Sequence, residues 1–278
     1  MTSIIELLQQ HLDDSEAIVL GAGSGFSTSA GFEYGGKTFL DNFKYMKEKY
    51  GYTDMYTAGF HSFKTAEEFW GYWSKFIYLN RYEKGATPLY KKLYELVKDK
   101  NYFVITTNVD HQFQKAGFDK NRLFYTQGDY GLFQCSHCKK TFDNENEIVE
   151  MLKNIDPETH KIPSSLVPKC PICGRNLTTN LRCDDTFVEN EGFYKARSNY
   201  ESFLKKYRNK KILFLELGVG YNTPVIIKYP FIRMTESNQS AFYVSVSLDY
   251  YNSVPDEIKS RSLIINDDIN EVISKLHS

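Results

Sequence analysis

The sequence has almost no net charge and no long hydrophobic run. It carries 34 Lys and Arg against 35 Asp and Glu, without a long basic segment. Proteins that bind nucleic acids neutralise phosphates with clustered positive charge, so this composition gives that class little support. No apolar stretch approaches the roughly 20 residues of a membrane span, and residues 1–15 lack the basic start of a signal peptide. We therefore expect a cytoplasmic protein with neither a nucleic-acid nor a membrane partner.

Cysteine is scarce, with only five residues in the chain. In the cytosol such cysteines serve more often as thiolate ligands than as disulfides. Four of them form two pairs of equal spacing, Cys135 with Cys138 and Cys170 with Cys173. Two such turns suit a tetrahedral Zn²⁺ ion, and a closed four-thiolate site stabilises rather than catalyses. A redox pair is the alternative, but no thioredoxin-like pattern surrounds either turn. We expect the fifth, Cys183, to be a buried free thiol.

Short apolar runs alternate with helical patterns along much of the chain. The runs that predict buried strands are residues 17–20, 102–105, 123–125, 212–217 and 242–246. Helices are predicted to begin after Thr2 or Ser3, at Thr87-Pro88 with Thr87 as the N-cap, and at Asp267-Asp268. This alternation predicts an α/β fold with a doubly wound, mainly parallel, Rossmann-like sheet.

Two segments interrupt the alternating pattern. Residues 35–85 contain an aromatic-rich helix after a Thr65-x-x-Glu68 capping box, and such a stripe indicates core packing. Residues 131–187 hold all five cysteines. We therefore predict a Rossmann-like NAD-binding domain of residues 1–34, 86–130 and 188–278, a small helical module at 35–85 and a zinc-binding module at 131–187.

A glycine-rich turn, Gly21-Ala22-Gly23-Ser24, follows the first predicted strand. Glycines at such a turn let the backbone approach a pyrophosphate, and the following helix supplies free N–H donors. Tight turns between a strand and a helix also use glycine for steric reasons alone. The turn is therefore a candidate phosphate site only in combination with other motifs.

Polar side chains follow two further strands. Asn108 and Asp110 come after residues 102–105, and Gln127 comes after residues 123–125. Ligands of open α/β sheets bind beyond the carboxyl ends of the strands, so these side chains are candidate site residues. The alternative is that Asn108 and Asp110 only cap the next helix.

The order and spacing of these motifs resemble the core of the sirtuins, the NAD-consuming protein deacylases. The resemblance rests on Gly21-Ala22-Gly23 with Ser29-Ala30-Gly31, on Thr106-Thr107-Asn108-Val109-Asp110, and on the cysteines. It implies that Asn108 contacts the nicotinamide ribose and that Asp110 anchors the nicotinamide amide. It also implies that residues 21–24 cradle the phosphates.

The same resemblance implies two cofactor contacts nearer the C-terminus. Gly218 falls where sirtuins place a turn against the ribose and phosphates. The small hydroxyl residues expected beside it are absent, and Asn222 and Thr223 come a little later. Ser247 lies about where the family contacts the adenosine. The alternating Val-Ser-Val-Ser that leads to it is also typical of any half-buried strand.

Two departures from the sirtuin pattern change the expected chemistry. Gln127-Gly128 replaces the His-Gly pair whose histidine is the general base, and Phe32-Glu33-Tyr34-Gly35 replaces Pro-Asp-Phe-Arg. A glutamine amide cannot accept a proton near neutral pH, whereas an imidazole can. The sequence therefore predicts NAD cleavage without the usual deacylation, with Asn108, Asp110 and Gln127 as the catalytic set.

With these departures the chain is most similar to the macrodomain-linked sirtuins. That resemblance implies a protein ADP-ribosyltransferase that modifies a lipoyl-carrier protein, and a macrodomain hydrolase that reverses the mark. Two alternatives remain open, an NAD-dependent deacylase with another base and a non-enzymatic NAD or ADP-ribose sensor.

Overall fold

The structure is a computed structural model that describes residues 3–220, 224–248 and 253–277. Asn222 and Thr223 lie outside the described residues. The chain divides into two compact units, which are described separately. Unit 1 comprises Met1–Gly31, Ala86–Gln127 and Glu191–Ser278, and unit 2 comprises Phe32–Gly85 and Gly128–Asn190. Both segments predicted as insertions thus fall in unit 2.

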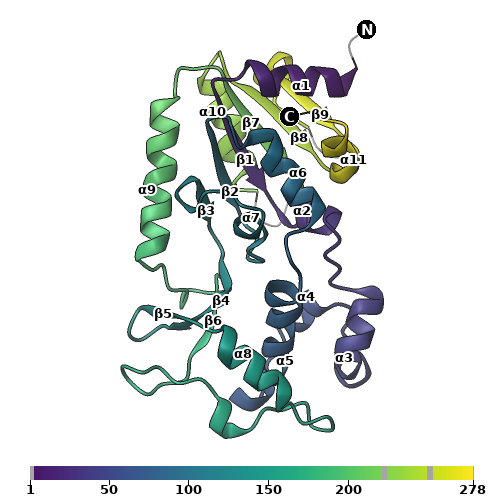
Figure 1. Ribbon diagram of the computed structural model, residues 1–278, viewed down its shortest axis with the longest axis vertical. Coiled ribbons are helices and arrows are strands. Elements are labelled where there is room, and N and C mark those ends of the chain that lie inside the picture. The colour runs from purple at the N-terminus through teal and green to yellow at the C-terminus, as the bar shows by residue number, and fades with distance from the viewer. Residues whose placement is uncertain (1–2, 221–223, 249–252, 278) are drawn as a thin grey trace. The chain divides into compact units, whose positions relative to one another are not determined.

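Unit 1 is built on a six-stranded sheet in the order β3-β2-β1-β7-β8-β9 (Figure 1). All neighbouring strands are parallel, and the doubly wound α/β fold predicted from the sequence is confirmed. The strands are β1 (Ala17–Ala22), β2 (Tyr102–Thr106), β3 (Leu123–Tyr125), β7 (Ile212–Leu217), β8 (Phe242–Val246) and β9 (Ser262–Ile265). The last of these was not predicted.

Helices cover both faces of this sheet because successive strand residues point to opposite sides. Alternate positions such as Ile18 and Leu20 join a core with α1 (Ile4–Asp14), α6 (Pro88–Val97) and α11 (Ile269–Ser274). On the other face, Phe103 contacts Tyr200 of α9 (Glu191–Lys206), and Phe214 contacts Phe231 of α10 (Lys228–Ser237). The remaining short helices of unit 1 are α2 (Ser24–Ser29), α7 (Gln112–Lys115) and the 3₁₀ turns Lys120–Arg122 and Asp256–Arg261.

Local capping explains where several helices begin. Ser3 and Glu6 form a capping box at the start of α1, and the Asp268 carboxylate accepts the N–H of Glu271 at the start of α11. Thr87 occupies the N-cap position of α6, but its side chain forms no capping bond. Its backbone N–H instead donates to Gln112 Oε1 at 3.0 Å. The predicted N-cap position of Thr87 is therefore confirmed, although the hydrogen bond that Thr87 forms there comes from its backbone.

Unit 2 combines helices with a three-stranded antiparallel sheet in the order β5-β4-β6. Its aromatic core includes Trp70, whose ring lies 4.9 Å from that of Phe133. The helices and strands are α3 (Gly36–Tyr50), α4 (Met55–Ala58), α5 (Ala66–Ile77), a π turn (Tyr78–Tyr82), β4 (Gly128–Cys135), β5 (Lys140–Asp143), α8 (Glu145–Lys153), a 3₁₀ turn (Ser164–Leu166) and β6 (Thr178–Leu181). No helix in the described part of the chain is long and apolar enough to cross a membrane.

A buried ion pair lies on the α10 face of the unit 1 sheet. Lys228 Nζ is 2.6 Å from Glu216 Oε1, and the two side chains are only 5% and 0% exposed. Tyr243 and Ser245 also donate to the Glu216 carboxylate, at 2.6 and 3.0 Å. A buried pair survives only when such bonds compensate the lost hydration. This pair could not be predicted from the sequence, because Glu216 stands inside an apolar strand run.

We expect Lys228→Met to destabilise unit 1 strongly. The substitution leaves the Glu216 carboxylate buried without its cation, which costs about 3–5 kcal/mol in comparable cases. Urea unfolding of Lys228→Met, Glu216→Leu and the double variant measures this cost. The double variant should recover most of the loss, since no unpaired charge remains; a double variant as unstable as the sum of the singles would contradict the role of the pair.

Candidate functional site

The predicted site residues of unit 1 lie along the carboxyl edge of its sheet. They follow five strands that are neighbours in the order β3-β2-β1-β7-β8. From one side to the other they are Gln127, Asn108 with Asp110, the glycine-rich turn, Gly218 and Ser247. The chain leaves β1 toward β2 on one side and later returns to β7 on the other, so the turn lies at a topological switch point. Open α/β sheets bind ligands at such points.

The glycines of this turn are required by the packing of the protein itself. A Cβ on Gly23 would lie 2.6 Å from the carbonyl oxygen of Gly218, and one on Gly25 would lie 2.9 Å from Gly218 Cα. Gly218 has φ 62°, and a Cβ there would meet Phe26 N at 2.4 Å. A Cβ on Gly21 would enter the side chains of α10. The steric explanation considered for the sequence therefore accounts for these glycines without a ligand.

Some backbone N–H groups of the turn already donate to other residues of the protein, so they are not available to a phosphate. Gly23 N donates to Leu217 O at 3.0 Å, and Gly25 N donates to Gly218 O at 3.0 Å. Ser24 is exposed at the start of α2, and neither its N–H nor its hydroxyl bonds to a described residue. Ala22 is a buried strand residue whose carbonyl accepts from Thr107 N. Of the four predicted residues 21–24, Ser24 is thus the one with unused donors.

Asn108 is tied directly to this turn. Its Nδ2 donates to Gly23 O at 2.9 Å and to the Tyr90 hydroxyl at 3.3 Å. Its backbone N–H donates to Thr106 Oγ1 at 3.0 Å, which fixes the start of the segment after β2. The side chain is half-buried. The structure therefore brings two of the predicted elements, the turn and Asn108, into contact.

Asp110 is 2% exposed and is held from two sides. Ser27 Oγ donates to its Oδ2 at 2.5 Å, and Gln112 N donates to its Oδ1 at 3.0 Å. The second bond is the helix-capping role considered for this residue, although α7 begins only at Gln112 and His111 occupies the N-cap position. Ser27 and Tyr90 were not predicted as site residues, and nothing in their sequence context distinguishes them from core residues.

Gln127 follows β3 and is half-buried. Among the described residues its amide donates only to Thr126 Oγ1, at 3.5 Å, so the amide is weakly held. Thr126 is anchored to the end of β2, because its backbone N donates to Thr106 O at an N···O distance of 2.9 Å. The position of Gln127 on the carboxyl edge is therefore defined, while its amide has both a donor and an acceptor to offer.

Ser247 lies at the far side of the same edge. It follows β8 directly, its side chain is mostly buried, and its backbone N–H donates to Ile265 O at 3.1 Å. Gly218 is connected to the same strand, because Gly218 N donates to Val246 O at 3.0 Å. The two predicted C-terminal contacts are thus carried by adjacent strands.

The four paired cysteines converge within unit 2. Their sulfur atoms all lie within 4.8 Å of one another. Cys135 Sγ and Cys173 Sγ are 3.7 Å apart, and Cys170 Sγ and Cys138 Sγ are 3.9 Å apart. These separations are far too long for a disulfide, but a tetrahedral site with Zn–S bonds of about 2.3 Å requires sulfurs roughly 3.8 Å apart. The quartet therefore fits Zn²⁺, and the redox-pair alternative finds no support.

The backbone shapes both cysteine turns in the same way. A left-handed residue follows each pair, Lys139 at φ 53° and Gly174 at φ 72°. Burial alone would raise the pKa of the Cys170 thiol, but backbone N–H groups and the neighbouring thiols lower it to about 7. The hydrogen bond with Cys173 and burial raise the pKa of Cys138 to about 12. Binding of a metal ion would thus release protons from this quartet.

Cys183 lies apart from the quartet and is exposed. The expectation that it is a buried thiol is therefore wrong. It sits in the loop after β6, beside Arg182 and Asp184, which are also exposed. Charged neighbours on both sides keep this part of the loop at the surface, a signal that the sequence already contained.

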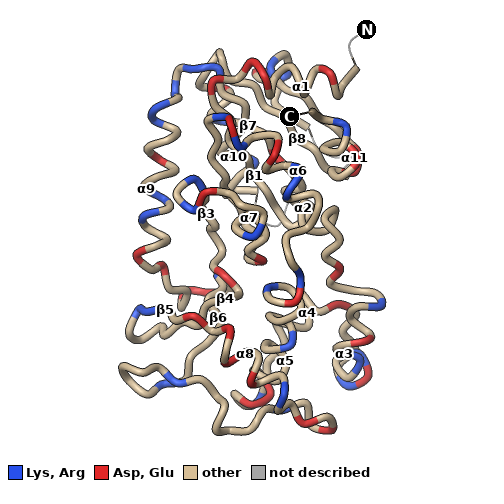
Figure 2. The backbone as a smooth tube through the Cα atoms, in the orientation of Figure 1, with Lys and Arg blue, Asp and Glu red and all other residues tan. Residues whose placement is uncertain are grey.

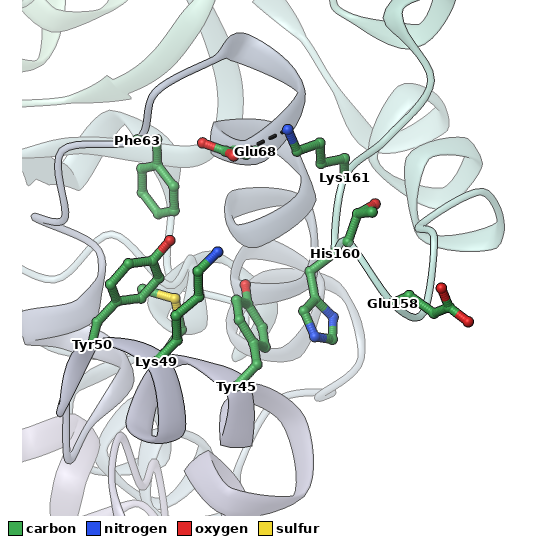
Figure 3. Close-up of a pocket in the computed structure, with 10 residues that line it drawn as sticks. Tyr45, Lys49, Tyr50, Phe63, Glu68, Glu158, His160 and Lys161 are labelled. Atoms are coloured by element: carbon green, nitrogen blue, oxygen red, sulfur yellow. Dashed lines mark ion pairs between the residues drawn. The ribbon is translucent and has the colours of Figure 1, made fainter.

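A surface cavity of about 380 Å³ lies within unit 2 and contains none of the predicted site residues (Figure 3). Tyr45 and Lys49 of α3 form one wall, and the loop with His160 and Lys161 forms another. The His160 ring stacks on Tyr45 at 3.8 Å, and Lys161 pairs with Glu68 at 3.1 Å. The cavity is lined by side chains of both signs of charge.

Charge is mixed along the described chain. Figure 2 shows Lys and Arg interspersed with Asp and Glu, as on α9, where Arg197 pairs with Glu201 at 3.0 Å. Such alternation is typical of solvated helix faces. It agrees with the near-zero net charge of the sequence.

Comparison with known proteins agrees with this geometry. The Sir2 family profile matches residues 23–212. A protein ADP-ribosyltransferase of Staphylococcus aureus (strain Mu50) is 36% identical over 276 residues, which cover 98% of this chain and 87% of the relative. A probable bifunctional ADP-ribose hydrolase/ADP-ribosyltransferase of Fusarium oxysporum f. sp. cubense is 30% identical over 81% of this chain and 39% of the relative.

Solved structures share the fold. Sir2Tm bound to a propionylated peptide aligns with a TM-score of 0.63 at 18% identity, and the alignment covers 98% of this chain and 96% of that chain. A Sir2 complex with p53 peptide and NAD⁺ aligns with a TM-score of 0.57 at 18% identity over the same shares. With a family profile over more than half of the sequence and a relative 36% identical over almost all of it, the chain belongs to the Sir2 family, that of the sirtuins.

Proposed function

We propose that the protein is an NAD-dependent protein ADP-ribosyltransferase. The observation that carries the proposal is the edge of the unit 1 sheet, where Asn108 and Asp110 are held in place and a neutral amide, Gln127, follows the adjacent strand β3. The name of the Staphylococcus aureus relative supports the same activity. In this reaction the bond between nicotinamide and ribose breaks and nicotinamide leaves. A protein side chain bonds to the ribose carbon, and its proton passes to water.

The protein contributes positioning to such a reaction. The transition state develops positive charge at the ribose, so residues that orient the ribose and its leaving group accelerate it without covalent chemistry. We assign Asn108 to the nicotinamide ribose and Asp110 to the nicotinamide amide. We assign Ser24 to the phosphates, together with the neighbouring Gly21, Ala22 and Gly23. The hydrogen bonds of Asp110 are strengthened because this carboxylate is buried.

Gly218 and Ser247 complete the proposed NAD site. Their strands, β7 and β8, are adjacent in the sheet. This places the two residues on the other side of the glycine-rich turn from Asn108, and a dinucleotide that crosses the switch point would reach both halves of the edge. We assign Gly218 to the ribose and phosphates and Ser247 to the adenosine.

Gln127 sets the choice between transfer and deacylation. An amide can donate to and accept from a ribose hydroxyl, but it does not take up a proton near neutral pH. Deacylation needs a base at the ribose, whereas transfer of ADP-ribose to a side chain does not. The weak hold on the Gln127 amide leaves it available for a hydroxyl of the substrate or acceptor.

We propose Zn²⁺ as a structural ion held by Cys135, Cys138, Cys170 and Cys173. All four ligands come from the protein, so the site has no open position for substrate. The ion would stabilise unit 2 and take no part in the transfer.

The acceptor is a protein in this proposal, and the similarity to macrodomain-linked sirtuins makes a lipoyl-carrier protein the first acceptor to test. A macrodomain hydrolase that removes the mark belongs to the same proposal. It is supported by the Fusarium relative, whose name joins a hydrolase to the transferase and which this chain matches over 39% of its length.

Isotope-labelled NAD with the purified protein and a lysate of its source cells tests the proposed function. We expect label on protein together with free nicotinamide. Nicotinamide release with loss of acyl groups and no labelled protein would identify a deacylase instead. Measurable NAD binding with neither product would identify a sensor.

We expect Gln127→Ala to lower transfer by about tenfold, the value of one lost hydrogen bond in the transition state. Gln127→His should not exceed the wild type in transfer, since no base is needed. The same assay run on an acylated peptide provides the opposite test. A Gln127→His variant that gains acyl removal beside an inactive Gln127→Ala would favour the deacylase.

A further inference from the structure

The side-chain amide of Asn108 can have only one orientation in this structure. Its partner on one side is the carbonyl oxygen of Gly23, which can only accept, so the nitrogen must face it. The second hydrogen of the same nitrogen reaches the hydroxyl of Tyr90 at 3.3 Å. Both amide hydrogens are thus used within unit 1, and Asn108 Oδ1 bonds to no described residue.

The hydroxyl of Tyr90 is itself oriented by a carboxylate two steps away. Ser27 Oγ donates to Asp110 Oδ2 at 2.5 Å, which uses the only hydrogen of that hydroxyl. Ser27 must therefore accept from Tyr90, whose hydroxyl lies 2.9 Å away. The three hydrogen bonds then share one donor-to-acceptor direction: Asn108 donates to Tyr90, Tyr90 donates to Ser27, and Ser27 donates to Asp110. Chains of this kind polarise one another and hold a single arrangement.

The ring of Tyr90 has a separate, apolar role. It is fully buried on α6 and lies 4.5 Å from the ring of Phe26 and 4.9 Å from that of Phe113. A phenylalanine would keep these contacts. The hydroxyl is therefore the part of the Tyr90 side chain that bonds to Asn108 and Ser27. Its contribution to the site can be measured separately from the packing of the ring.

We propose that Tyr90 is a positioning residue whose hydroxyl locks the Asn108 amide so that Oδ1, a hydrogen-bond acceptor, is the atom offered to substrate. This inference rests on the proposed function. It narrows the chemistry that the site recognises, because the substrate must present a donor to Asn108, as a ribose hydroxyl does. It also links Asn108 to Asp110, so that the two proposed NAD contacts are set by one network.

Tyr90→Phe tests this role, with Tyr94→Phe as the matched control on the same helix. Tyr94 is half-buried against Phe118 and forms no hydrogen bond with the described residues of the network. We expect Tyr90→Phe to lower kcat for nicotinamide release about tenfold, as one lost oriented hydrogen bond does, with KM for NAD within about twofold. Its Tm should stay within about 5 °C of the wild type.

Coupling to Asn108 separates positioning from stability. Adding Tyr90→Phe to Asn108→Ala should cause no further loss, because the group that Tyr90 positions is already gone. Full kcat in Tyr90→Phe, an equal loss in Tyr94→Phe, or additive losses in the double variant would overturn the proposal while leaving the proposed function in place. Full nicotinamide release in Asn108→Ala would remove the proposed function and the role of Tyr90 together.

Discussion

Asn108→Ala should lower nicotinamide release from NAD by at least about 100-fold, the usual effect of losing a group that orients the reacting centre. The reason lies in how this side chain is held. Asn108 is anchored to Gly23 and Tyr90, so its remaining oxygen has a defined position at the carboxyl edge of the sheet. Alanine removes that oxygen and leaves water in its place. Single-turnover release of labelled nicotinamide measures the loss.

The control for Asn108→Ala is Asn101→Ala. Asn101 stands at the opposite end of β2 and also donates from its side-chain amide to a backbone carbonyl, that of Glu16 at 3.1 Å. The two substitutions therefore remove similar hydrogen bonds at the two ends of one strand. Asn101→Ala should keep full release. A comparable loss in both variants would show that Asn108 supports the fold of unit 1 and not the reaction.

The sheet of unit 1 could be predicted because its strands are buried on both faces. A run such as Ile212–Leu217 is almost continuously apolar, which is typical of parallel strands between two helix layers. β9 was missed because Ser262–Ile265 is a short edge strand that pairs only with β8 and is partly exposed. Its residues carry no alternation that separates them from a loop.

The sequence indicated which residues follow the strands of the sheet, but it did not indicate the contacts between their side chains. Parallel strands bring Asn108, Gln127 and Gly218 to one edge. The position of Asn108 and Gln127 at the carboxyl ends of strands made them candidates, whereas Gly218 was chosen from the resemblance to sirtuins. The contact of Ser27 with Tyr90 joins residues 63 positions apart, and neither residue stands in a motif. The spacing of the cysteines was informative because a chelating turn is local in sequence, whereas a network of core hydroxyls is not.

The sequence-based division treats the two segments of unit 2 as separate modules, whereas the structure groups them in one compact unit. The helical segment and the cysteine-rich segment are separated by more than 40 residues of unit 1, yet both belong to one compact unit. Packing of α5 against α8 and of Trp70 against Phe133 joins them. Aromatic residues that looked like the core of a separate helical module are the shared core of both segments.

Loss of the cysteine quartet should have the largest effect on stability. We expect one zinc ion per chain in the purified protein, and no bound zinc in Cys135→Ser. Structural zinc sites contribute on the order of 10 kcal/mol of apparent binding free energy at neutral pH, which is comparable to the whole stability of a typical domain. Unit 2 should therefore lose its ordered structure in this variant, and limited proteolysis should cleave within residues 128–190.

Cys183→Ser is the matched control, because it makes the same chemical change at an exposed thiol outside the quartet. It should keep one zinc per chain and the wild-type cleavage pattern. A chelator added to the wild type should reproduce the effect of Cys135→Ser, and the effect should grow as pH falls, since protons compete with the metal for the thiolates. Zinc-free protein with wild-type resistance to proteolysis would instead show that the sulfur cluster is stable by packing alone, and the 3.7 Å spacing of its sulfurs would then need another cause.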